Sequence, residues 1–424
     1  MMRSKKMQTR HIAHIVVEAD TPLKVGSNAS DFLQDSPIQR DFNGLPMILG
    51  TSIAGVLRKD FNKEKVVDIF GEENGSKVVF SNALLCKNVK NEVCEELLLE
   101  KSDFLKLFET LPIREYTAIT DKGVAHAHAK FDEEVLYKGT RFKFSVEVLE
   151  NEESFEKILA FLLSSSFRIG GGSSKGFGKL KVLEIKKESF VLESYENYSS
   201  SLNHTLQKPH TSKESDSQTH TKYTLKITPE DFFIFGSGFG DRDANATPVY
   251  EYAIDYENEK LSKKNLLLPA SSIKGALAHR TTFHYNSLKG YSIEAKNGVS
   301  SLEAIFGSAK DSENKKGSKG KILISDCFKE QREETKTFDH VAIDRFTGGA
   351  IDGALFQEKT VAQQDEWEVE ILLKKSVDGD KLKAFEKALI DITTGMLPLG
   401  GMTTKGHGVF VGNILRDGQV IKHD

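Results

Sequence analysis

The chain carries one nine-residue loop pattern twice, and this repetition limits the folds that it can adopt. The first copy, residues 170–178, reads GGGSSKGFG, and the second copy, residues 400–408, reads GGMTTKGHG. Both copies fit the pattern G-G-x-[ST]-[ST]-K-G-x-G. One glycine-rich loop is a weak signal, but two copies that each close a similar half-chain indicate an internal duplication.

Three further pairs of segments recur in the same order in the two halves. They are LP followed by SIAGVL at 45–57 and LP followed by SIKGAL at 268–277, DIFG at 68–71 and AIFG at 304–307, and the stretches 114–149 and 338–373. We therefore predict two domains of one fold, at 8–187 and 222–418. The residues between them, 188–221, are rich in Ser, Thr, His, Lys and Glu, which predicts a flexible linker.

Hydrophobic periodicity predicts the element order β-α-β-β-α-β in each half. The predicted elements of the first half are 11–18, 51–61, 77–85, 141–149, 153–166 and 177–185. Those of the second half are 222–228, 271–285, 321–328, 366–373, 380–394 and 409–414. The helix at 51–61 is predicted to have Thr51 or Ser52 as its N-cap. This order is that of the split βαβ motif, so the predicted fold class is α+β, with two tandem ferredoxin-like domains.

The composition is typical of a soluble globular chain, with 38% hydrophobic and 28% charged residues. The apolar runs are too short to span a bilayer, and residues 1–10 are polar and basic without a signal-peptide segment behind them. The three cysteines lack the spacing of a zinc site or a disulfide framework. We therefore expect a cytoplasmic protein. Because the net charge is −4, nucleic-acid binding would require a local basic face or an assembly.

The two glycine loops are the first candidate binding sites. Backbone N–H groups of a glycine-rich turn, with nearby hydroxyls and a lysine, can converge on a phosphate group. A mononucleotide P-loop is excluded, because here the lysine precedes a glycine and the loop leads from a helix to a strand. The alternative is that the glycines only permit a tight turn. The candidate residues are Gly171, Ser173, Ser174, Lys175 and Gly176, and Gly401, Thr403, Thr404, Lys405 and Gly406.

The openings of the two predicted first helices are the second candidate. They place Ser52 and Ser272 where unsatisfied N–H groups attract phosphate, with Arg58, Lys274 and Arg280 close by in the sequence. The alternative is ordinary capping of a helix that carries solvated basic residues.

At these residues the chain resembles a known family. The glycine loop before the last strand, the LPASSIKGAL opening at 268–277 and the β-α-β-β-α-β order are similar to the RAMP superfamily (repeat-associated mysterious proteins) of CRISPR systems. TPLKVGS at 21–27, DSPIQRD at 35–41 and IDRFTGGA at 343–350 resemble segments of the backbone subunits of type III effector complexes, the last being the hairpin called the thumb. The resemblance covers nearly all of both halves and suggests a double backbone subunit.

The resemblance implies two RAMP domains with inserted thumb hairpins that bind a CRISPR guide RNA, meet a complementary target RNA and contact other effector subunits, without a membrane. It further implies that Asp35 cleaves target RNA with Mg²⁺ or another divalent cation, since a carboxylate beside a scissile phosphate can hold the metal. In the second half Ala246 takes the corresponding place, and Asp243 and Asp241 are weaker candidates. Basic residues at the thumbs are candidate RNA contacts, namely Arg114, Lys122, Lys130, Lys138 and Arg345.

Several alternatives remain open at this point. The chain could be a structural guide-binding subunit that cuts nothing, a stand-alone guide-processing endoribonuclease that needs no metal, or a metabolite-binding protein. Asp35 could only cap a turn before Pro37. His126 and His128 lie on one face of an extended segment, as half of a metal site or as part of a polar hairpin.

Overall fold

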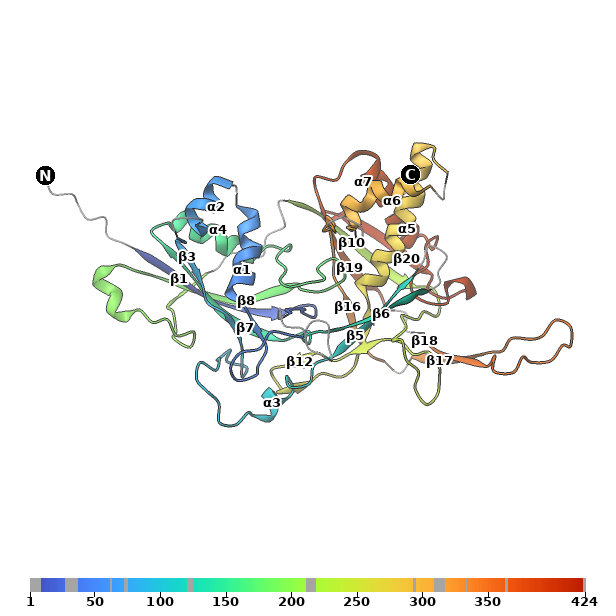
Figure 1. Cartoon of the computed structure of the whole chain (residues 1–424), viewed down its shortest axis with the longest axis horizontal. Coiled ribbons are helices and arrows are strands. Elements are labelled where there is room, and N and C mark those ends of the chain that lie inside the picture. Colours follow the sequence, from blue (N-terminus) through green and yellow to red (C-terminus); the bar gives the residue numbers. More distant parts are fainter. Residues whose placement is uncertain are drawn as a thin grey trace.

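The computed structural model describes residues 9–26, 37–61, 63–71, 75–119, 125–210, 219–292, 295–308, 317–332, 334–362 and 365–421. It shows two halves, each with an antiparallel sheet and a set of helices. Apart from the short helix at Asp103–Lys106, the labelled helices of both halves lie toward the upper side of the view in Figure 1. Within the described residues, no helix has the length and apolar character needed to cross a membrane.

The first half is built on a sheet with the strand order β2-β4-β7-β1-β8-β9, in which β3 also pairs with β7. Its elements are β1 (Arg10–Ala19), β2 (Met47–Ile48), α1 (Gly50–Leu57), η1 (Arg58–Asp60), α2 (Lys63–Phe70), β3 (Val78–Phe80), β4 (Ala83–Leu85), α3 (Asp103–Lys106), β5 (Ile113–Ile119), β6 (Ala125–Glu134), β7 (Arg141–Leu149), α4 (Glu152–Leu162), β8 (Leu180–Phe190), η2 (Leu192–Asn197) and β9 (Lys208–Pro209). The central strand β1 pairs antiparallel with β7 and β8.

The second half repeats this plan with the strand order β15-β19-β10-β20-β21. Its elements are β10 (His220–Pro229), β11 (Tyr250–Glu251), β12 (Ile254–Asp255), β13 (Lys260–Leu261), β14 (Asn265–Leu268), α5 (Ala270–Lys289), α6 (Lys296–Phe306), β15 (Ile322–Ile324), β16 (Cys327–Glu330), β17 (Thr335–His340), β18 (Phe356–Val361), β19 (Trp367–Lys374), α7 (Gly379–Thr393), η3 (Thr403–Lys405), β20 (Phe410–Arg416) and β21 (Gln419–Val420). The element order β10-α5-β15-β19-α7-β20 is the predicted one, as is β1-α1-β3-β7-α4-β8 in the first half.

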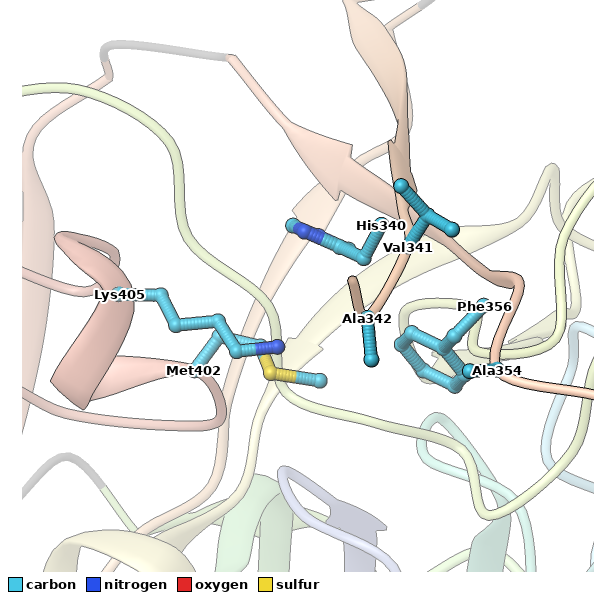
Figure 2. A pocket seen from close by; sticks show the side chains of 7 residues that line it. All are labelled: His340, Val341, Ala342, Ala354, Phe356, Met402 and Lys405. Atoms are coloured by element: carbon cyan, nitrogen blue, oxygen red, sulfur yellow. The ribbon is translucent and has the colours of Figure 1, made fainter. Parts of the chain in front are cut away.

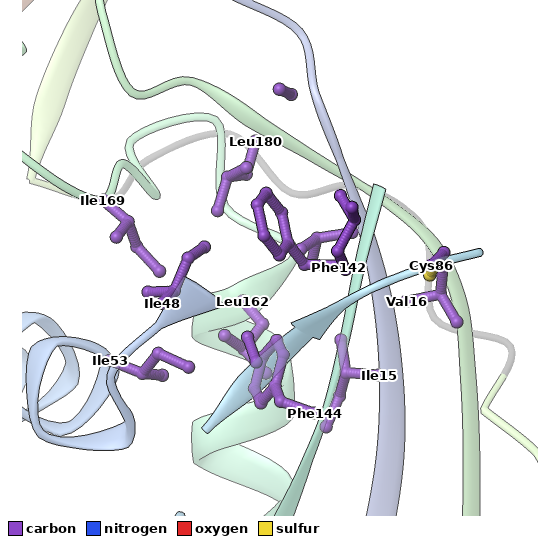
Figure 3. Packing of buried hydrophobic residues seen from close by; sticks show 14 of the residues in the cluster. Ile15, Val16, Ile48, Ile53, Cys86, Phe142, Phe144, Leu162, Ile169 and Leu180 are labelled. Carbon is purple, nitrogen blue, oxygen red and sulfur yellow. The ribbon is translucent and has the colours of Figure 1, made fainter. Parts of the chain in front are cut away.

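Each half has its own apolar core between sheet and helices. In β7 the alternating residues Phe142, Phe144, Val146 and Val148 are all fully buried, as their period-two spacing predicts. Figure 3 shows Phe142 and Phe144 among aliphatic side chains, including Leu162 from α4. A separate core in the second half forms around the side chains of β19, α5 and α7.

Each half also extends a two-stranded hairpin from its sheet. The β5–β6 hairpin of the first half reaches toward the second half, and the β17–β18 hairpin of the second half points away from the molecule (Figure 1). Residues 341–350 of the second hairpin are almost all exposed. The inner hairpin thus meets the other half of the same chain, where Arg114 contacts Glu251 and Asp326, whereas the described tip of the outer hairpin is exposed.

The segment predicted as a linker is largely part of the first half. Strand β8 continues to Phe190, and β9 pairs with it near Lys186 and Lys187. Phe190 and Leu206 bury their side chains against Ile12 of β1. The polar composition misled the prediction, because three apolar residues are enough to anchor this segment to the outer side of the sheet. Of the predicted linker, residues 211–218 lie outside the described residues.

The first helix of each half is capped from a distant loop and not by its own hydroxyls. Helix α1 begins at Gly50, so the predicted N-caps Thr51 and Ser52 lie inside the helix. The N–H of Gly50 donates to Oδ1 of Asn82 at 2.9 Å, and that of Ala270 in α5 donates to Oδ1 of Asp326 at 2.7 Å. The cap is therefore supplied by a residue that follows β3 in the first half and β15 in the second half. The sequence around the start of each helix does not reveal this residue.

Candidate functional site

The two glycine loops have the same backbone conformation. Matched hydrogen bonds hold them to the segment after the first strand: Gly171 N to Lys24 O and Gly401 N to Ile234 O at 2.8 and 2.7 Å, and Gly178 N to Pro22 O and Gly408 N to Phe232 O at 2.9 Å each. Positive φ values also recur at equivalent positions, with Met402 at +55° where Gly172 has +72°. The duplication predicted from the sequence is therefore a duplication of loop geometry.

The glycines are required by this backbone. At Gly170 and Gly400 the φ angles are +88° and +93°, and a methyl group would collide with the carbonyl oxygen of Lys24 or Ile234. The glycines alone would thus be explained by the turn, which was one of the two interpretations left open. Any binding role rests on the hydroxyls and lysines that the turn presents.

The first loop is docked against the second half of the chain. Gly176 forms an isolated parallel bridge with Ser325, and the Nζ of Lys274 in α5 donates to Oγ of Ser174 at 3.2 Å. Ser173 and Gly176 are buried as a result. Ser173, Ser174 and Gly176 therefore lie at a junction between the two domains, while Gly171 remains exposed.

A buried group of charges holds this junction together. Arg114 of β5 contacts Asp326 at 2.5 Å and Glu251 at 2.6 Å, and all three side chains are almost completely buried. Burial opposes the charge of Arg114, but the two carboxylates outweigh it and hold the pKa of the guanidinium above its usual value. Arg114 was a candidate RNA contact on sequence grounds; the structure assigns it to the domain junction instead.

Two lysines of the junction lie near each other beside a hydroxyl. Lys274 of α5 donates to Ser174, and Lys175, the next residue of the first loop, is close enough for its charge to act on Lys274. Burial, and secondarily the positive charge of Lys175, lowers the pKa of Lys274. Lys175 lies 4.0 Å from Glu133, so it is only loosely paired. Two cations and a hydroxyl at one point form an environment that an anion would stabilise.

Gly176→Ala is expected to destabilise the folded chain more than Gly406→Ala does. The φ angles are +116° and +91°, so alanine strains the backbone by about 1–2 kcal/mol at either position. At Gly176 the added methyl group also collides with the carboxylate of Asp326, whereas no described atom lies within 4 Å of a methyl group at Gly406. Urea unfolding measures the difference. Equal losses in the two variants would contradict the docking of the first loop.

The second loop is more exposed than the first. Thr404, Lys405 and Gly406 are exposed, and Gly401 and Thr403 are half-buried. Beside this loop lies a cavity of about 420 Å³, toward which Figure 2 shows Lys405 and His340 directed from opposite sides. The same loop geometry is therefore packed against the other domain in the first half and partly exposed to solvent in the second half.

The predicted basic residues at the helix openings are not all brought together. Ser52 and Ser272 lie in the first turns of α1 and α5, but Arg58 follows the last residue of α1. Arg280 lies midway along α5 and donates to Asp391 of α7, which also contacts His284 at 2.7 Å. Lys274 meets the first glycine loop at Ser174.

The predicted catalytic residue Asp35 lies outside the described residues. Its counterpart follows from the matched bridges Gly26–Ile38 and Gly236–Pro248, which enclose loops of equal length. Counting residues from these bridges pairs Asp35 with Asn245, one residue before the Ala246 that the sequence alignment gives. The side chain of Asn245 accepts the N–H of Gln357 at 2.7 Å.

The weaker catalytic candidates Asp241 and Asp243 both lie near the side chain of Lys359. Oδ2 of Asp241 lies 2.5 Å from Nζ of Lys359, and Asp243 lies 3.4 Å from the same nitrogen. The hydrogen bond from Lys359, together with backbone N–H groups, lowers the pKa of Asp241. Among the described residues no group of three or more His, Cys, Asp or Glu side chains could hold a metal ion. The aspartates of this loop therefore do not fit a divalent-cation site by themselves.

The basic residues predicted at the thumbs lie in different environments. Arg345 lies exposed near the tip of the β17–β18 hairpin, and Lys138 pairs with Asp20 at 3.1 Å. Lys122 is outside the described residues, and the side chains of Lys130, His126 and His128 are not described. Sequence reasoning missed Asp326, His340 and Glu358 as partners of the loops. The signal that could have found them is their position in the second copy, where they correspond to Asn82, Tyr116 and Glu133 of the first.

Comparison with known proteins gives one family. The sequence model of the RAMP superfamily matches residues 16–181 and 251–411, most of both halves. A search of curated proteins gives no match. Among solved structures, a chain from "Cryo-EM structure of the Type III-B Cmr-beta bound to cognate target RNA" is similar, with 15% identity and a TM-score of 0.32. That match covers 42% of this chain and 61% of the other, so this chain spans less than two thirds of that structure's length.

Proposed function

This chain belongs to the RAMP superfamily, and from that premise we propose that it is an RNA-binding backbone subunit of a type III CRISPR effector complex. Its partners in this proposal are a guide RNA, a complementary target RNA and other effector subunits. The proposal includes a ferredoxin-like fold for both domains. The strand orders β8-β1-β7-β3 and β20-β10-β19-β15, with two helical crossovers in each half, support that assignment.

One observation carries the RNA-binding proposal: where the first loop touches α5, Lys274 donates to Ser174 and feels the positive charge of the neighbouring Lys175. Two lysines held near each other in a half-buried site repel, and an RNA phosphate between them would remove that repulsion. The equivalent loop at the free end of the chain presents Thr404 and Lys405 to solvent. A strand of RNA could thus be held at two points with the same local geometry.

The β17–β18 hairpin would act as a thumb. Its tip exposes Phe346 completely, and Ile343 beside it is 60% exposed. Asp344 accepts the N–H groups of Phe346 and Thr347 at 2.7 and 2.8 Å, so the turn that carries the ring is internally ordered. An exposed ring on an ordered turn is suited to stacking on a base, and Arg345 next to it is suited to a phosphate.

The catalytic part of the proposal is cleavage of target RNA at Asp35. A divalent cation such as Mg²⁺, held by Asp35, would stabilise the charge that develops on the scissile phosphate. At the corresponding place the second half has Ala246 by sequence alignment and Asn245 by loop length, and neither is a carboxylate. We therefore propose that the first domain cuts and the second domain only binds. A subunit that cuts nothing is the alternative, and the Asp35 variant below separates the two.

Removal of the junction lysine is expected to weaken guide-RNA binding in a salt-dependent way. In Lys274→Ala one phosphate contact is lost, so the slope of log K against log salt concentration should fall by about 0.7–1. Lys289→Ala is the matched control, because Lys289 ends the same helix and pairs with Asp380 at 2.6 Å. Filter binding of the full chain to guide RNA over a salt series measures both. An unchanged slope in Lys274→Ala would contradict the proposed contact.

A further inference from the structure

The two halves of the chain meet through two different surfaces. The first half contributes the side that carries its glycine loop, and the second half contributes the outer face of its sheet, away from its helices. On that outer face Glu370 of β19 lies 3.1 Å from Lys179 and 3.7 Å from Arg168 of the first half. At the edge of the same sheet Asp326 contacts Arg114. The contact within the chain is therefore between unlike surfaces.

A contact of this kind leaves two matching surfaces at the ends of a duplicated chain. They are the outer face of the first sheet and the glycine-loop side of the second half, where Thr404, Lys405 and Gly406 are exposed. If both were open, copies of the chain could join end to end by the contact that joins the halves. A contact between unlike surfaces that does not close into a ring produces open filaments.

Strand register identifies the outer face of the first sheet that corresponds to the one around Glu370. Thr224 of β10 pairs with Glu370, and His14 of β1 pairs with Ser145 of β7. His14 and Thr224 lie equally far in sequence before the glycines that form the matched bridges described above. Ser145 is therefore the counterpart of Glu370, and His14 lies beside it on the face where another domain would dock.

In the first half this face is covered by the chain's own residues 190–209, here called the strap. The Nδ1 group of His14 donates to the carbonyl oxygen of His204 at 3.1 Å. Phe190 and Leu206 of the strap bury their side chains against Ile12, which lies on the same face of β1 as His14. Figure 1 shows the start of the strap, in light green, at the side of the first half that is away from the second half.

The strap is held by hydrogen bonds that a simple connection between domains does not need. The side-chain amide of Asn203 accepts the N–H of Val93 at 3.0 Å and donates to the carbonyl oxygen of Val93 at 2.9 Å. The hydroxyl of Tyr198 donates to Glu147 of β7 at 2.6 Å. These bonds and the buried apolar side chains give the strap a defined place on the sheet.

The two ends of the chain also lack two ion pairs of the junction, on both sides of each pair. In the second half Phe338 and Val409 take the places of Arg114 and Lys179, as the pairing of the hairpins and the ends of the glycine loops show. On the first sheet Asn82 and Ser145 take the places of Asp326 and Glu370. A contact between copies would therefore leave neither pair half-formed, so charge does not prevent it.

We propose that the strap prevents end-to-end association of this chain, because it covers the face of the first domain on which the glycine-loop side of a second copy would otherwise dock. The partner that the covered face fits is thus the second domain of another copy. The strap makes the first domain an end of the row of domains. The inference concerns the chain without RNA, so it stands or falls independently of the proposed function.

The test releases the strap without changing the sheet beneath it. The double variant Asn203→Ala, Leu206→Asp removes both hydrogen bonds to Val93 and places a charge against Ile12 whenever the strap is docked, which favours the undocked strap. Hydrogen exchange shows whether the release is local. The N–H groups of residues 198–208 are expected to lose protection, and those of β1 and β7 are expected to keep it.

Sedimentation velocity over a series of protein concentrations then measures association. The unmodified chain is expected to stay monomeric. The released variant is expected to reach about twice the monomer mass or more as its concentration rises, because an end-to-end contact can add further copies. Association of the unmodified chain through this face, or a released variant that stays monomeric with β1 and β7 protected, overturns the inference.

A matched pair of substitutions shows whether the released chain associates through the predicted surface. In the released variant Val409→Glu places a charge on the glycine-loop side of the second half and is expected to abolish association. Val420→Glu, at an exposed apolar residue of β21, is the control and should leave association unchanged. An equal effect of the two substitutions would mean nonspecific contact between exposed apolar residues, which also overturns the inference.

A milder variant covers the case in which the charge at position 206 disturbs the sheet. Leu206→Ala weakens the packing against Ile12 without introducing a charge, and it is expected to associate less than the double variant but more than the unmodified chain. If β1 and β7 lose protection in this variant as well, the strap is an inseparable part of the sheet and not a cover, and the inference is wrong.

Discussion

Asp35→Asn is expected to slow target-RNA cleavage by about 10²- to 10⁴-fold, the usual contribution of one positioned catalytic group, and to leave RNA binding unchanged. The amide has nearly the shape of the carboxylate but neither holds a divalent cation nor accepts a proton as well. The measurement is the rate of cutting of a labelled complementary RNA by the assembled complex, beside its affinity for the same RNA. If the variant complex cuts as fast as the unmodified complex, Asp35 is not the catalytic residue and the subunit only holds the RNA.

Asp243→Asn is the matched control for this variant. Asp243 is an exposed aspartate in the equivalent loop of the second half, where it lies 3.4 Å from Lys359. Its removal should leave the cleavage rate within experimental error. Asn245→Asp tests the register in the other direction, since it restores a carboxylate at the position equivalent to Asp35. The hydrogen bond from the N–H of Gln357 can be accepted by either side chain.

Arg114→Ala is expected to lower the free energy of unfolding by about 3–5 kcal/mol, because it leaves two buried carboxylates without their counter-charge. The guanidinium is 5% exposed, Asp326 is not exposed at all, and Glu251 is 12% exposed. Urea unfolding of the full chain measures the loss. Arg345→Ala, at an exposed hairpin tip, is the control and should change stability by no more than about 0.5 kcal/mol.

A second variant separates the loss of charge balance from the loss of packing. In the triple variant Arg114→Met, Asp326→Asn, Glu251→Gln no buried charge is left unpaired, and Asn can still cap α5 as Asn82 caps α1. This chain should be considerably more stable than Arg114→Ala. If the two are equally unstable, the contribution of Arg114 comes from its stacking on Phe177, whose ring centroid lies 4.7 Å away.

The elements and the duplication could be predicted from the sequence because their signals are local. The alternation of Phe142, Phe144, Val146 and Val148 specifies a buried strand face, and the glycine pattern specifies positive φ at fixed positions. Helix caps were predicted wrongly for the opposite reason. Asn82 and Asp326 reach their helices from loops 32 and 56 residues away, which no local pattern encodes.

The partners of the candidate site also depended on tertiary contacts. Arg114 was predicted to contact RNA because it lies at the first thumb, but its partners Glu251 and Asp326 come from the other half of the chain. Glu358 contacts His407 of the second loop, whereas its first-half counterpart Glu133 pairs with Lys24. Comparing the two copies position by position makes such residues visible, once the structure has fixed the register.

Asn82 and Asp326 do the same work for their helices, yet one is neutral and the other carries a charge. The exchange of an amide for a carboxylate makes the two caps electrostatically different. The carboxylate of Asp326 pairs with Arg114, whereas the amide of Asn82 carries no charge to attract an arginine. The two halves therefore differ chemically at this position although their folds repeat. The cap of α5 can thus form an ion pair with the other half of the chain, which the cap of α1 cannot do.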